Sequence, residues 1–331
     1  MKLFFVLRVL LTALLCWSGV AFAQGAPVES GERSLSEWLT RMHEASRRRA
    51  YTGTFVVLSD GQMASSRIWH VCDGEKQIER VESLTGKPRA TFRRNEEVIT
   101  FAPEARVAVT ERREGLNMFP HLLKAPGTNV EQFYAMRHEG RERVAGFEAD
   151  VLLLRPNDRL RHGYRIWSER KTGLVIKLQT LDPEERVLEQ AAFSELQLDA
   201  PVSMDKLARM MGNTEGYTVR SVAQVKTTPA AEGWRLKAQI PGFAWVSCYR
   251  RPEAERQTLQ WVFTDGLASV SLFLETFDAS RHLKEGALSL GATQMLTRRI
   301  EDARHQRWWL TAVGEVPRQT LEAFAQSVER K

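Results

Sequence analysis

The segment YTGTFVVL at residues 51–58, the turn signal Asp60-Gly61 and the returning segment SRIWHV at residues 66–71 decide the fold. Aromatic and β-branched residues dominate both segments, and Asp-Gly is a favoured turn between paired strands. The sequence therefore predicts a β-hairpin here. The pattern continues on the C-terminal side of this hairpin and changes to a helical one on its N-terminal side.

Short apolar runs separated by turn residues follow the hairpin. We expect strands at residues 77–81, 90–94, 98–101, 106–110, 149–154, 164–169, 174–181 and 187–196. A meander of about ten short antiparallel strands twists strongly and curls around its apolar face. Val151 and Ile166 alternate with charged neighbours, which supports an unclosed barrel with an apolar interior.

The region before the hairpin begins with a helix signal. Ser34-Leu35-Ser36-Glu37 has the form of a capping box, and apolar residues then recur at helical spacing. We expect an amphipathic helix over residues 35–48.

The first 23 residues have the pattern of a secretory signal peptide. Lys2 and Arg8 flank an apolar run, and Ala21-Phe22-Ala23 forms a small-x-small cleavage site before Gln24. Cys16 lacks the small preceding residue that lipid attachment requires. We therefore expect an exported protein that is soluble after cleavage.

Length and charge narrow the class of protein. Cleavage leaves 308 of the 331 residues, more than one compact core usually holds, so we expect two domains. Cleavage removes two of 47 basic residues and none of the 41 acidic ones, which leaves a net charge of +4. In an envelope compartment the available anions are lipid head groups, lipopolysaccharide phosphates and acidic proteins, and nucleic acid is not an expected partner.

The second half of the chain predicts a separate, smaller α+β unit. Strand patterns occur at residues 234–239, 244–249, 258–264, 268–276 and 308–313, and Pro317 precedes a helical stripe. We expect a large domain over residues 24–205, a linker over residues 206–232 and a small domain over residues 233–331. Cys72 and Cys248 fall in different domains, and the sequence leaves open whether they are free or bridged.

Local motifs of catalysis are missing from the sequence. We find no phosphate-binding loop, no pair of histidines at zinc-ligand spacing and no nucleophile elbow. We therefore predict no enzyme, no catalytic residue, no metal and no cofactor. A hydrolase assembled from distant residues remains an alternative, because such a site leaves no local trace.

Aromatic residues on the predicted strands are candidates for a ligand-binding wall. Phe55, Trp69, Tyr164 and Trp167 could together line a concave apolar surface, or they could form an ordinary core.

Several strings, in order along the chain, resemble the RseB/MucB family of periplasmic regulators of the envelope-stress sigma factor. In the first half they are YTGTF at residues 51–55, RIWH at 67–70, RVAG at 143–146, PNDR at 156–159 and GYRIW at 163–167. In the second half they are PGF at residues 241–243, TDGLASVS at 264–271 and VGEVP at 313–317. His162 and Phe101 depart from the pattern we expect of relatives.

The resemblance implies a fold and a function. The fold is a large unclosed β-barrel with helices, like the lipoprotein carriers LolA and LolB, with an apolar cavity and a smaller C-terminal α+β domain. The implied function is to bind the periplasmic domain of a transmembrane anti-sigma factor of the RseA/MucA type and to shield it from the site-1 protease. Lipid or lipopolysaccharide would release the protein. The resemblance also makes self-association plausible.

Within this expected fold, the sequence suggests roles for particular residues. Phe119, Leu122 and Leu123 lie in a proline-broken apolar run and are expected to form a gate over the cavity, and Arg93 and Arg94 are candidates for lipid phosphates. For the anti-sigma factor we expect the groove between the domains and the segment that contains Thr264, Asp265, Gly266 and Glu275. A lipid or lipoprotein carrier without a regulatory partner remains the main alternative function.

Overall fold

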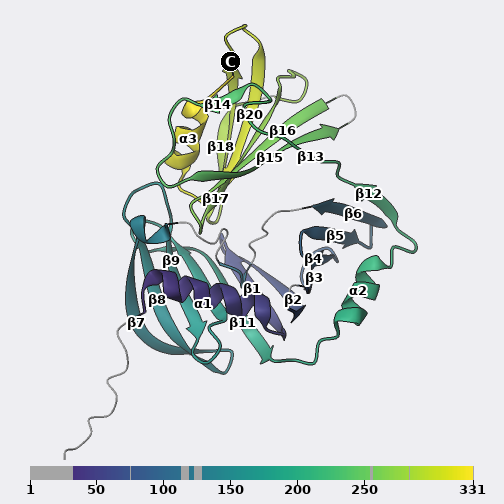
Figure 1. Cartoon of the computed structure of the whole chain (residues 1–331), viewed down its shortest axis with the longest axis vertical. Coiled ribbons are helices and arrows are strands. Elements are labelled where there is room, and N and C mark those ends of the chain that lie inside the picture. Colours follow the sequence, from purple (N-terminus) through teal and green to yellow (C-terminus); the bar gives the residue numbers. More distant parts are fainter. Residues whose placement is uncertain are drawn as a thin grey trace, which may run out of the picture. The chain divides into compact units, whose positions relative to one another are not determined.

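The computed structural model describes residues 33–74, 76–112, 119–122, 129–253, 256–282 and 284–330. The predicted signal peptide and the predicted gate residue Leu123 lie outside them. The described residues form a larger and a smaller β-sheet, a two-stranded sheet and three α-helices, α1 (Leu35–Arg48), α2 (Met204–Gly212) and α3 (Arg318–Ser327). Figure 1 shows how these elements are arranged. A short 3-10 helix, η1, covers Val130–Gln132.

The larger sheet contains twelve strands among the described residues and is antiparallel except for one edge pair. Its order is β12-β6-β5-β4-β3-β2-β1-β11-β10-β9-β8-β7. The strands are β1 (Tyr51–Ser59), β2 (Gln62–Asp73), β3 (Lys76–Ser83), β4 (Ala90–Arg94), β5 (Glu97–Ala102), β6 (Val107–Arg112), β7 (Tyr134–Val144), β8 (Phe147–Pro156), β9 (Gly163–Glu169), β10 (Val175–Leu181), β11 (Val187–Leu198) and β12 (Thr218–Ser221).

This sheet is unclosed, because its edge strands β7 and β12 do not pair with each other. Helix α1 begins at the predicted capping box and packs Trp38, Leu39 and Met42 against Leu152 and Ile166 of the sheet. The predicted meander, the helix and the unclosed wall are thus confirmed. We refer to this sheet with α1 and α2 as the large domain.

Strands β7 and β12 of the large domain were both missed in the sequence, β12 because it falls in the predicted linker. β7 reads YAMRHEGRERV, in which charged and polar residues mask any apolar alternation. Such a composition is usual on a sheet edge, where charges discourage pairing with other chains. The strand is held by its hairpin with β8 rather than by its own apolar content.

The smaller sheet contains seven strands among the described residues, in the order β13-β15-β16-β17-β20-β19-β18. The strands are β13 (Val225–Lys226), β15 (Ala244–Glu253), β16 (Arg256–Thr264), β17 (Ser269–Thr276), β18 (Gly286–Leu290), β19 (Thr293–Glu301) and β20 (Arg307–Gly314). A separate pair joins β14 (Trp234–Leu236) to β21 (Val328–Arg330). Together with α3 they form what we call the small domain, whose core contains Phe263, Leu272 and Phe324.

The segment predicted as a linker is largely structured. Residues 206–232 include most of α2, whose Leu207 and Met211 pack on Phe92 and Ile99, and β12, which pairs in parallel with β6. The limits of the two domains remain a prediction. The fold class, mostly antiparallel α+β with a smaller second domain, is confirmed.

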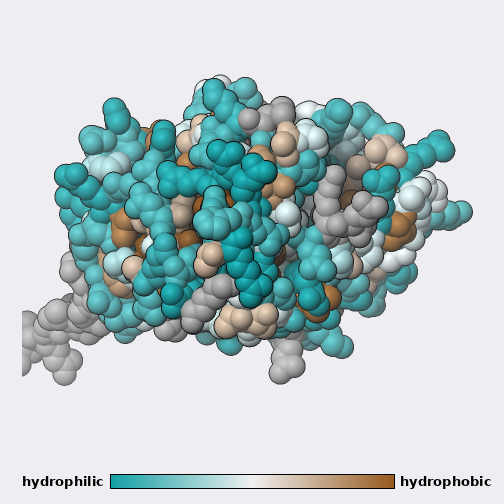
Figure 2. All heavy atoms as spheres, turned by 90° about the horizontal axis from the view of Figure 1, so that it is seen from above, coloured by the Kyte–Doolittle hydropathy of each residue, from teal (hydrophilic) through white to brown (hydrophobic). Residues whose placement is uncertain are grey.

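The face drawn in Figure 2 is mainly hydrophilic, and apolar residues appear on it in separated groups. Leu288 and Leu290 on the edge strand β18 are 60% and 65% exposed. Among the described residues, we find no helix with the length and apolar character needed to span a bilayer.

Candidate functional site

A cavity of about 260 Å³ lies between the large domain's wall and the small domain. Its apolar lining consists of Phe55, Val57, Phe119, Leu122, Leu178, Ala191 and Leu267, and its polar lining of His121, Tyr164, Thr180, Glu189 and Glu315. Leu267 and Glu315 come from the small domain. The site therefore exists only where the two domains meet.

Strand alternation explains why these side chains share one space. Residues two apart on a strand point to the same face, and Val57 and Leu178 both pair with Ala191 in the register of β1, β10 and β11. Gly53 lies four residues before Val57 on β1 and lets the Phe193 ring pack closely on the strand, because a Cβ at this position would lie 2.9 Å from that ring. Phe193 in turn packs against Phe55.

Phe119 and Leu122 lie in the cavity wall. The Phe119 ring is 5.5 Å from that of Phe55 and 5.0 Å from that of Phe193, and Leu122 is 6% exposed. The surrounding apolar side chains bury Leu122. Their role as a gate stays a prediction, and Leu123 lies outside the described residues.

Of the four aromatic candidates on strands, the cavity contains Phe55 and Tyr164. Trp167 is three residues from Tyr164 on β9 and faces the other side of the sheet, where its indole N–H donates to Glu142 (2.8 Å) and Lys177 lies over its ring. Trp69 is partly buried beneath Arg67 and Arg80, away from the cavity. Both tryptophans thus have protein neighbours in place of a cavity.

The predicted phosphate-binding arginines do not line the cavity. The Nε of Arg93 donates to the Asn95 carbonyl oxygen (2.7 Å), and Arg94 forms an exposed ion pair with Glu97 (2.8 Å). Contacts of either residue with lipid phosphate remain a prediction.

A cluster of titratable groups adjoins the cavity at His121. Its Nε2 is 3.1 Å from Glu79 Oε2, and its ring is 6.0 Å from that of His70, which stacks on Tyr51. Burial opposes ionisation of Glu79, but the hydrogen bond and charge of His121 hold the pKa of this carboxyl below its usual value. Burial lowers the pKa of His70. The hydrogen bond between His121 and Glu79 joins the 119–122 segment to β3.

The polar end of the cavity contains unusual side chains. Tyr164 is 3% exposed, its hydroxyl has no hydrogen-bond partner, and burial raises its pKa well above the usual value. Burial and then the charge of Glu315 raise the pKa of Glu189. Both carboxyls are partly buried at this end.

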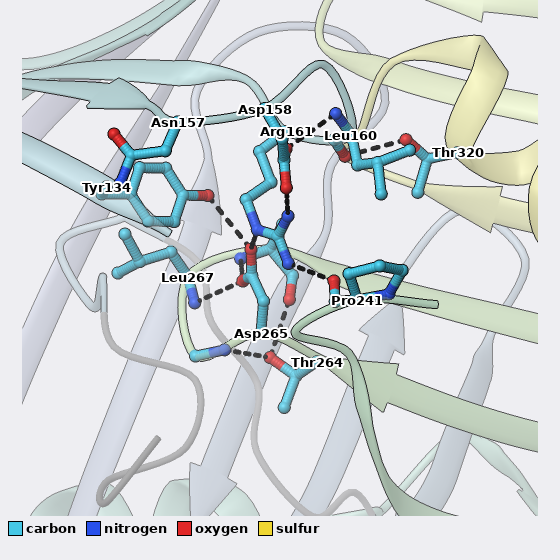
Figure 3. A network of polar contacts seen from close by, with 12 residues as sticks. Tyr134, Asn157, Asp158, Leu160, Arg161, Pro241, Thr264, Asp265, Leu267 and Thr320 are labelled. Carbon is cyan, nitrogen blue, oxygen red and sulfur yellow. Dashed lines mark hydrogen bonds and ion pairs between the residues drawn. The ribbon is translucent and has the colours of Figure 1, made fainter. Parts of the chain in front are cut away.

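A buried ion pair joins the two domains next to the cavity (Figure 3). The Nε of Arg161 donates to Asp265 Oδ2 (2.7 Å), and both side chains have no exposed surface. Arg161 also donates to Asp158 and to the Pro241 carbonyl oxygen, and its guanidinium lies 4.3 Å from the ring centre of Phe133. We call Arg161, Asp265, Asp158 and Tyr134 the interdomain network.

Asp265 also determines where Leu267 lies. Its Oδ2 accepts from the Tyr134 hydroxyl (3.1 Å), and its Oδ1 accepts from the backbone N–H groups of Leu267 (2.9 Å) and Ala268 (2.7 Å). The carboxylate therefore holds both the domain contact and the turn that places Leu267 in the cavity wall.

Three of the four predicted partner-binding residues are buried in this turn. Thr264 donates to the Ala268 carbonyl oxygen and accepts from the Gly266 N–H, and Thr264 and Asp265 are 3% and 1% exposed. These three residues are buried in the described structure, and their contact with an anti-sigma factor stays a prediction. Glu275 lies away from the turn on β17, with His282 (3.1 Å) and Arg281 (3.3 Å) as neighbours.

Arg161 was not identified in the sequence. It lies 104 residues from Asp265, and no local pattern marks such a pair. The one available signal was the charged run 158–161, which also fits a solvated turn.

The described residues contain no group of three or more His, Cys, Asp or Glu side chains arranged to hold a metal ion. Cys72 and Cys248 are free, the latter fully buried. What the site offers chemically is a mainly apolar space whose lining also includes two carboxyl groups, two hydroxyl groups and an imidazole.

Comparison with known proteins gives matches along nearly the whole described chain. The family model of the MucB/RseB N-terminal domain matches residues 34–211, and that of the MucB/RseB C-terminal domain matches residues 228–329. The sigma factor AlgU regulatory protein MucB of Pseudomonas aeruginosa is 27% identical over 301 residues, covering 88% of this chain and 90% of that protein. The sigma-E factor regulatory protein RseB of Escherichia coli K12 is 24% identical over 327 residues, covering 95% and 97%.

Solved structures agree with these matches. A crystal structure of MucB in complex with MucA(peri) has a TM-score of 0.69 at 26% identity, over 90% of this chain and 99% of that chain. A complex structure of Pseudomonas aeruginosa MucA/MucB has a TM-score of 0.70 at 26% identity, over 89% and 98%.

Proposed function

The chain belongs to the MucB/RseB family, and from this membership we propose that it is a negative regulator of an envelope-stress sigma factor. It acts in the periplasm, to which residues 1–23 direct its export. It binds the periplasmic domain of a transmembrane anti-sigma factor of the RseA/MucA type and shields that domain from the site-1 protease. Lipid or lipopolysaccharide releases it, and it catalyses no reaction itself.

The observation that carries this proposal is the match of both domains in order, over residues 34–211 and 228–329. A relative that aligns over nine-tenths of the chain has been solved in complex with MucA(peri). This chain has both domains of the family, in the same order.

The cavity supports the lipid step of the proposal. Each methylene buried there contributes about 0.8 kcal/mol, so a short alkyl segment is enough to shift a binding equilibrium. A lipid acts as a switch only if it binds the released form better than the partner-bound form. The small domain's Leu267 in the wall supplies a route, because a ligand that moves Leu267 acts on the turn held by Asp265.

A lipid or lipoprotein carrier is the second candidate, and the cavity itself favours it. A carrier would use the cavity without a regulatory partner. The small domain argues for regulation, because it contributes to the wall and is joined to the large domain by a buried ion pair.

Protection from proteolysis tests the proposal. The periplasmic domain of the anti-sigma factor from the same organism is incubated with the site-1 protease, with and without the mature protein, and then with lipopolysaccharide added. We expect the protein to slow cleavage and lipopolysaccharide to restore it. Cleavage at the same rate with and without the protein would refute regulation, and lipid binding alone would then favour a carrier.

Two neighbouring alanines on β11 provide a matched pair for the lipid step. Ala191 lines the cavity, whereas Ala192 points to the opposite face of the strand. Ala191→Leu fills the cavity, so we expect it to protect the partner but to respond weakly to lipid. Ala192→Leu should respond to lipid like the natural protein. Equal responses of the two variants would show that release by lipid does not depend on the cavity.

A further inference from the structure

The cavity wall contains a polar row of side chains beside an apolar row. The polar row lies across β9, β10, β11 and β1, where register places these residues opposite one another: Tyr164, Thr180, Glu189 and Ser59. The apolar row lies two residues away on the same strands and consists of Ile166, Leu178, Ala191 and Val57. Residues two apart on a strand share a face, and all of these except Ser59 and Ile166 line the cavity. Such a division fits an alkyl chain that carries one polar group.

The Tyr164 hydroxyl is available to a ligand in this cavity. Its side chain is 3% exposed, and the hydroxyl has no hydrogen-bond partner among the described residues. The nearby Tyr134 hydroxyl donates to Asp265 (3.1 Å). Buried hydroxyls in native proteins are normally paired, so the Tyr164 hydroxyl marks a place where a ligand or a water completes the hydrogen bonding.

The carboxyl groups of the wall disfavour an ionic ligand group at this place. Glu189 is hydrogen-bonded to the Ser59 hydroxyl and to the backbone of Ala292. Glu315 also has an interaction partner within the protein. Neither carboxyl is therefore free to pair with a cation, and both would repel an anion. A neutral group that donates and accepts hydrogen bonds suits the Tyr164 hydroxyl best, because burying it costs far less than burying an unpaired charge.

We propose that the cavity binds an alkyl chain that carries a neutral hydroxyl group, with this hydroxyl paired to Tyr164 beside Thr180 and the methylenes against the apolar row. The inference rests on the proposed function, because it specifies the chain of the lipid that releases the protein. The ligand hydroxyl can donate to the Tyr164 oxygen and accept from the Thr180 hydroxyl. The acyl chain of a glycolipid and a free hydroxylated lipid share this chemistry.

The volume agrees with one chain segment. At about 30 Å³ for each non-hydrogen atom, taken as the share of one water molecule, a cavity of about 260 Å³ holds a segment of about eight atoms. The cavity therefore takes up part of one chain and no head group. The phosphates and sugars of a lipopolysaccharide stay outside it, so the carboxyl groups of the wall do not oppose release by such a lipid.

A matched pair of neutral ligands tests the proposal with the mature protein and without any partner. Methyl 3-hydroxyoctanoate and methyl octanoate have the same chain and differ by one hydroxyl group, and isothermal titration calorimetry measures the affinity of each. In a cavity without a hydrogen-bond partner the hydroxyl would weaken binding, because it loses its water on entry. We expect the natural protein to bind the hydroxylated ester at least as tightly as the plain ester.

A single variant then assigns this behaviour to Tyr164. Tyr164→Phe should weaken binding of the hydroxylated ester at least fivefold relative to the plain ester, the net effect of one hydrogen bond. Its melting temperature should not fall, because the hydroxyl that it removes has no partner in the protein. Tyr217→Phe is the matched control, since Tyr217 packs on Phe101 and does not line the cavity. It should bind both esters like the natural protein.

The protection assay with lipopolysaccharide distinguishes the two sources of the chain. If the chain belongs to lipopolysaccharide, Tyr164→Phe should require at least fivefold more of it than the natural protein for release of the anti-sigma factor. If a free hydroxylated lipid is the ligand, the variant and the natural protein should be released at the same concentration of lipopolysaccharide.

Three results would overturn the proposal. They are weaker binding of the hydroxylated ester than of the plain ester by the natural protein, the same ratio of the two affinities in Tyr164→Phe, and no binding of either ester. If the natural protein still shields the anti-sigma factor and lipopolysaccharide still releases it, the proposed function stands and only this inference fails. Conversely, binding that depends on Tyr164 in a protein that does not slow cleavage would support the lipid site and refute regulation.

Discussion

Asp265→Asn should weaken the contact between the two domains strongly, although it changes one atom. The asparagine keeps Oδ1 as acceptor for the backbone N–H groups of Leu267 and Ala268. Its amide nitrogen, however, would face two donors, the Arg161 Nε at 2.7 Å and the Tyr134 hydroxyl at 3.1 Å. The charge of Arg161, which has no exposed side-chain surface, would lose its fully buried partner.

The expected loss is about 3 kcal/mol of unfolding free energy, at the lower end of the range for breaking a buried ion pair. The lower end applies because Arg161 keeps Asp158, whose side chain is 30% exposed, as a second partner. By contrast, Glu97→Gln breaks an exposed pair with Arg94 and should cost less than about 1 kcal/mol.

Unfolding in guanidinium, followed by tryptophan fluorescence, measures the unfolding free energy of both variants. Because the chain has two domains, each unfolding transition is fitted with its own midpoint. The double variant Arg161→Met/Asp265→Asn should lose less than the sum of its single changes, because no unpaired buried charge remains. A loss below 1 kcal/mol for Asp265→Asn, or strict additivity in the double variant, would refute the assignment of this pair as the main polar contact between the domains.

Three further predictions concern single positions. Gly242→Ala should destabilise the protein by about 1–3 kcal/mol more than Gly61→Ala, as measured by denaturation. Both glycines have positive φ, but a Cβ at Gly242 would lie 2.1 Å from Arg161 Nη2, whereas one at Gly61 meets nothing within 4 Å. Equal losses of stability in the two variants would contradict this. The pKa of Glu189 is raised in the folded state, so the stability that its protonated carboxyl contributes is present below the unfolded-state pKa near 4.5 and is lost as pH rises through the folded-state pKa. Glu189→Gln should therefore flatten the curve of stability against pH above pH 4.5. An unchanged curve would show that Glu189 does not contribute to it. A thiol-reactive dye should label Cys72 and spare Cys248 in the folded protein, because burial raises the pKa of the Cys248 thiol to about 12, with labelling of both in denaturant as the control.

Elements with a strong local pattern could be predicted from the sequence. The capping box at Ser34 determines where α1 begins, and the period of two in residues 51–58 and 66–71 predicts the first hairpin. Both depend on interactions between residues close in the chain, which leave a periodic trace. β7 could not be found in this way, because its charged residues suit an edge and hide the strand.

The site was predicted only in part. Phe55 and Tyr164 were identified as aromatic residues on strands, but no local pattern favoured them over Trp167, whose face of β9 depends on the register with its neighbours. Glu189 and Glu315 stand 126 positions apart in the chain and were not recognised as neighbours.

By itself, the sequence determined the family, the two α+β units and the apolar faces of their strands, since each follows from local periodicity or from ordered strings of residues. The tertiary structure alone decided that Asp265 is buried against Arg161, that Leu267 closes the wall and that two acidic groups border one cavity. These features arise where one domain packs on the other, and the free energy of such a contact depends on distances between residues far apart in the chain, which no local pattern encodes.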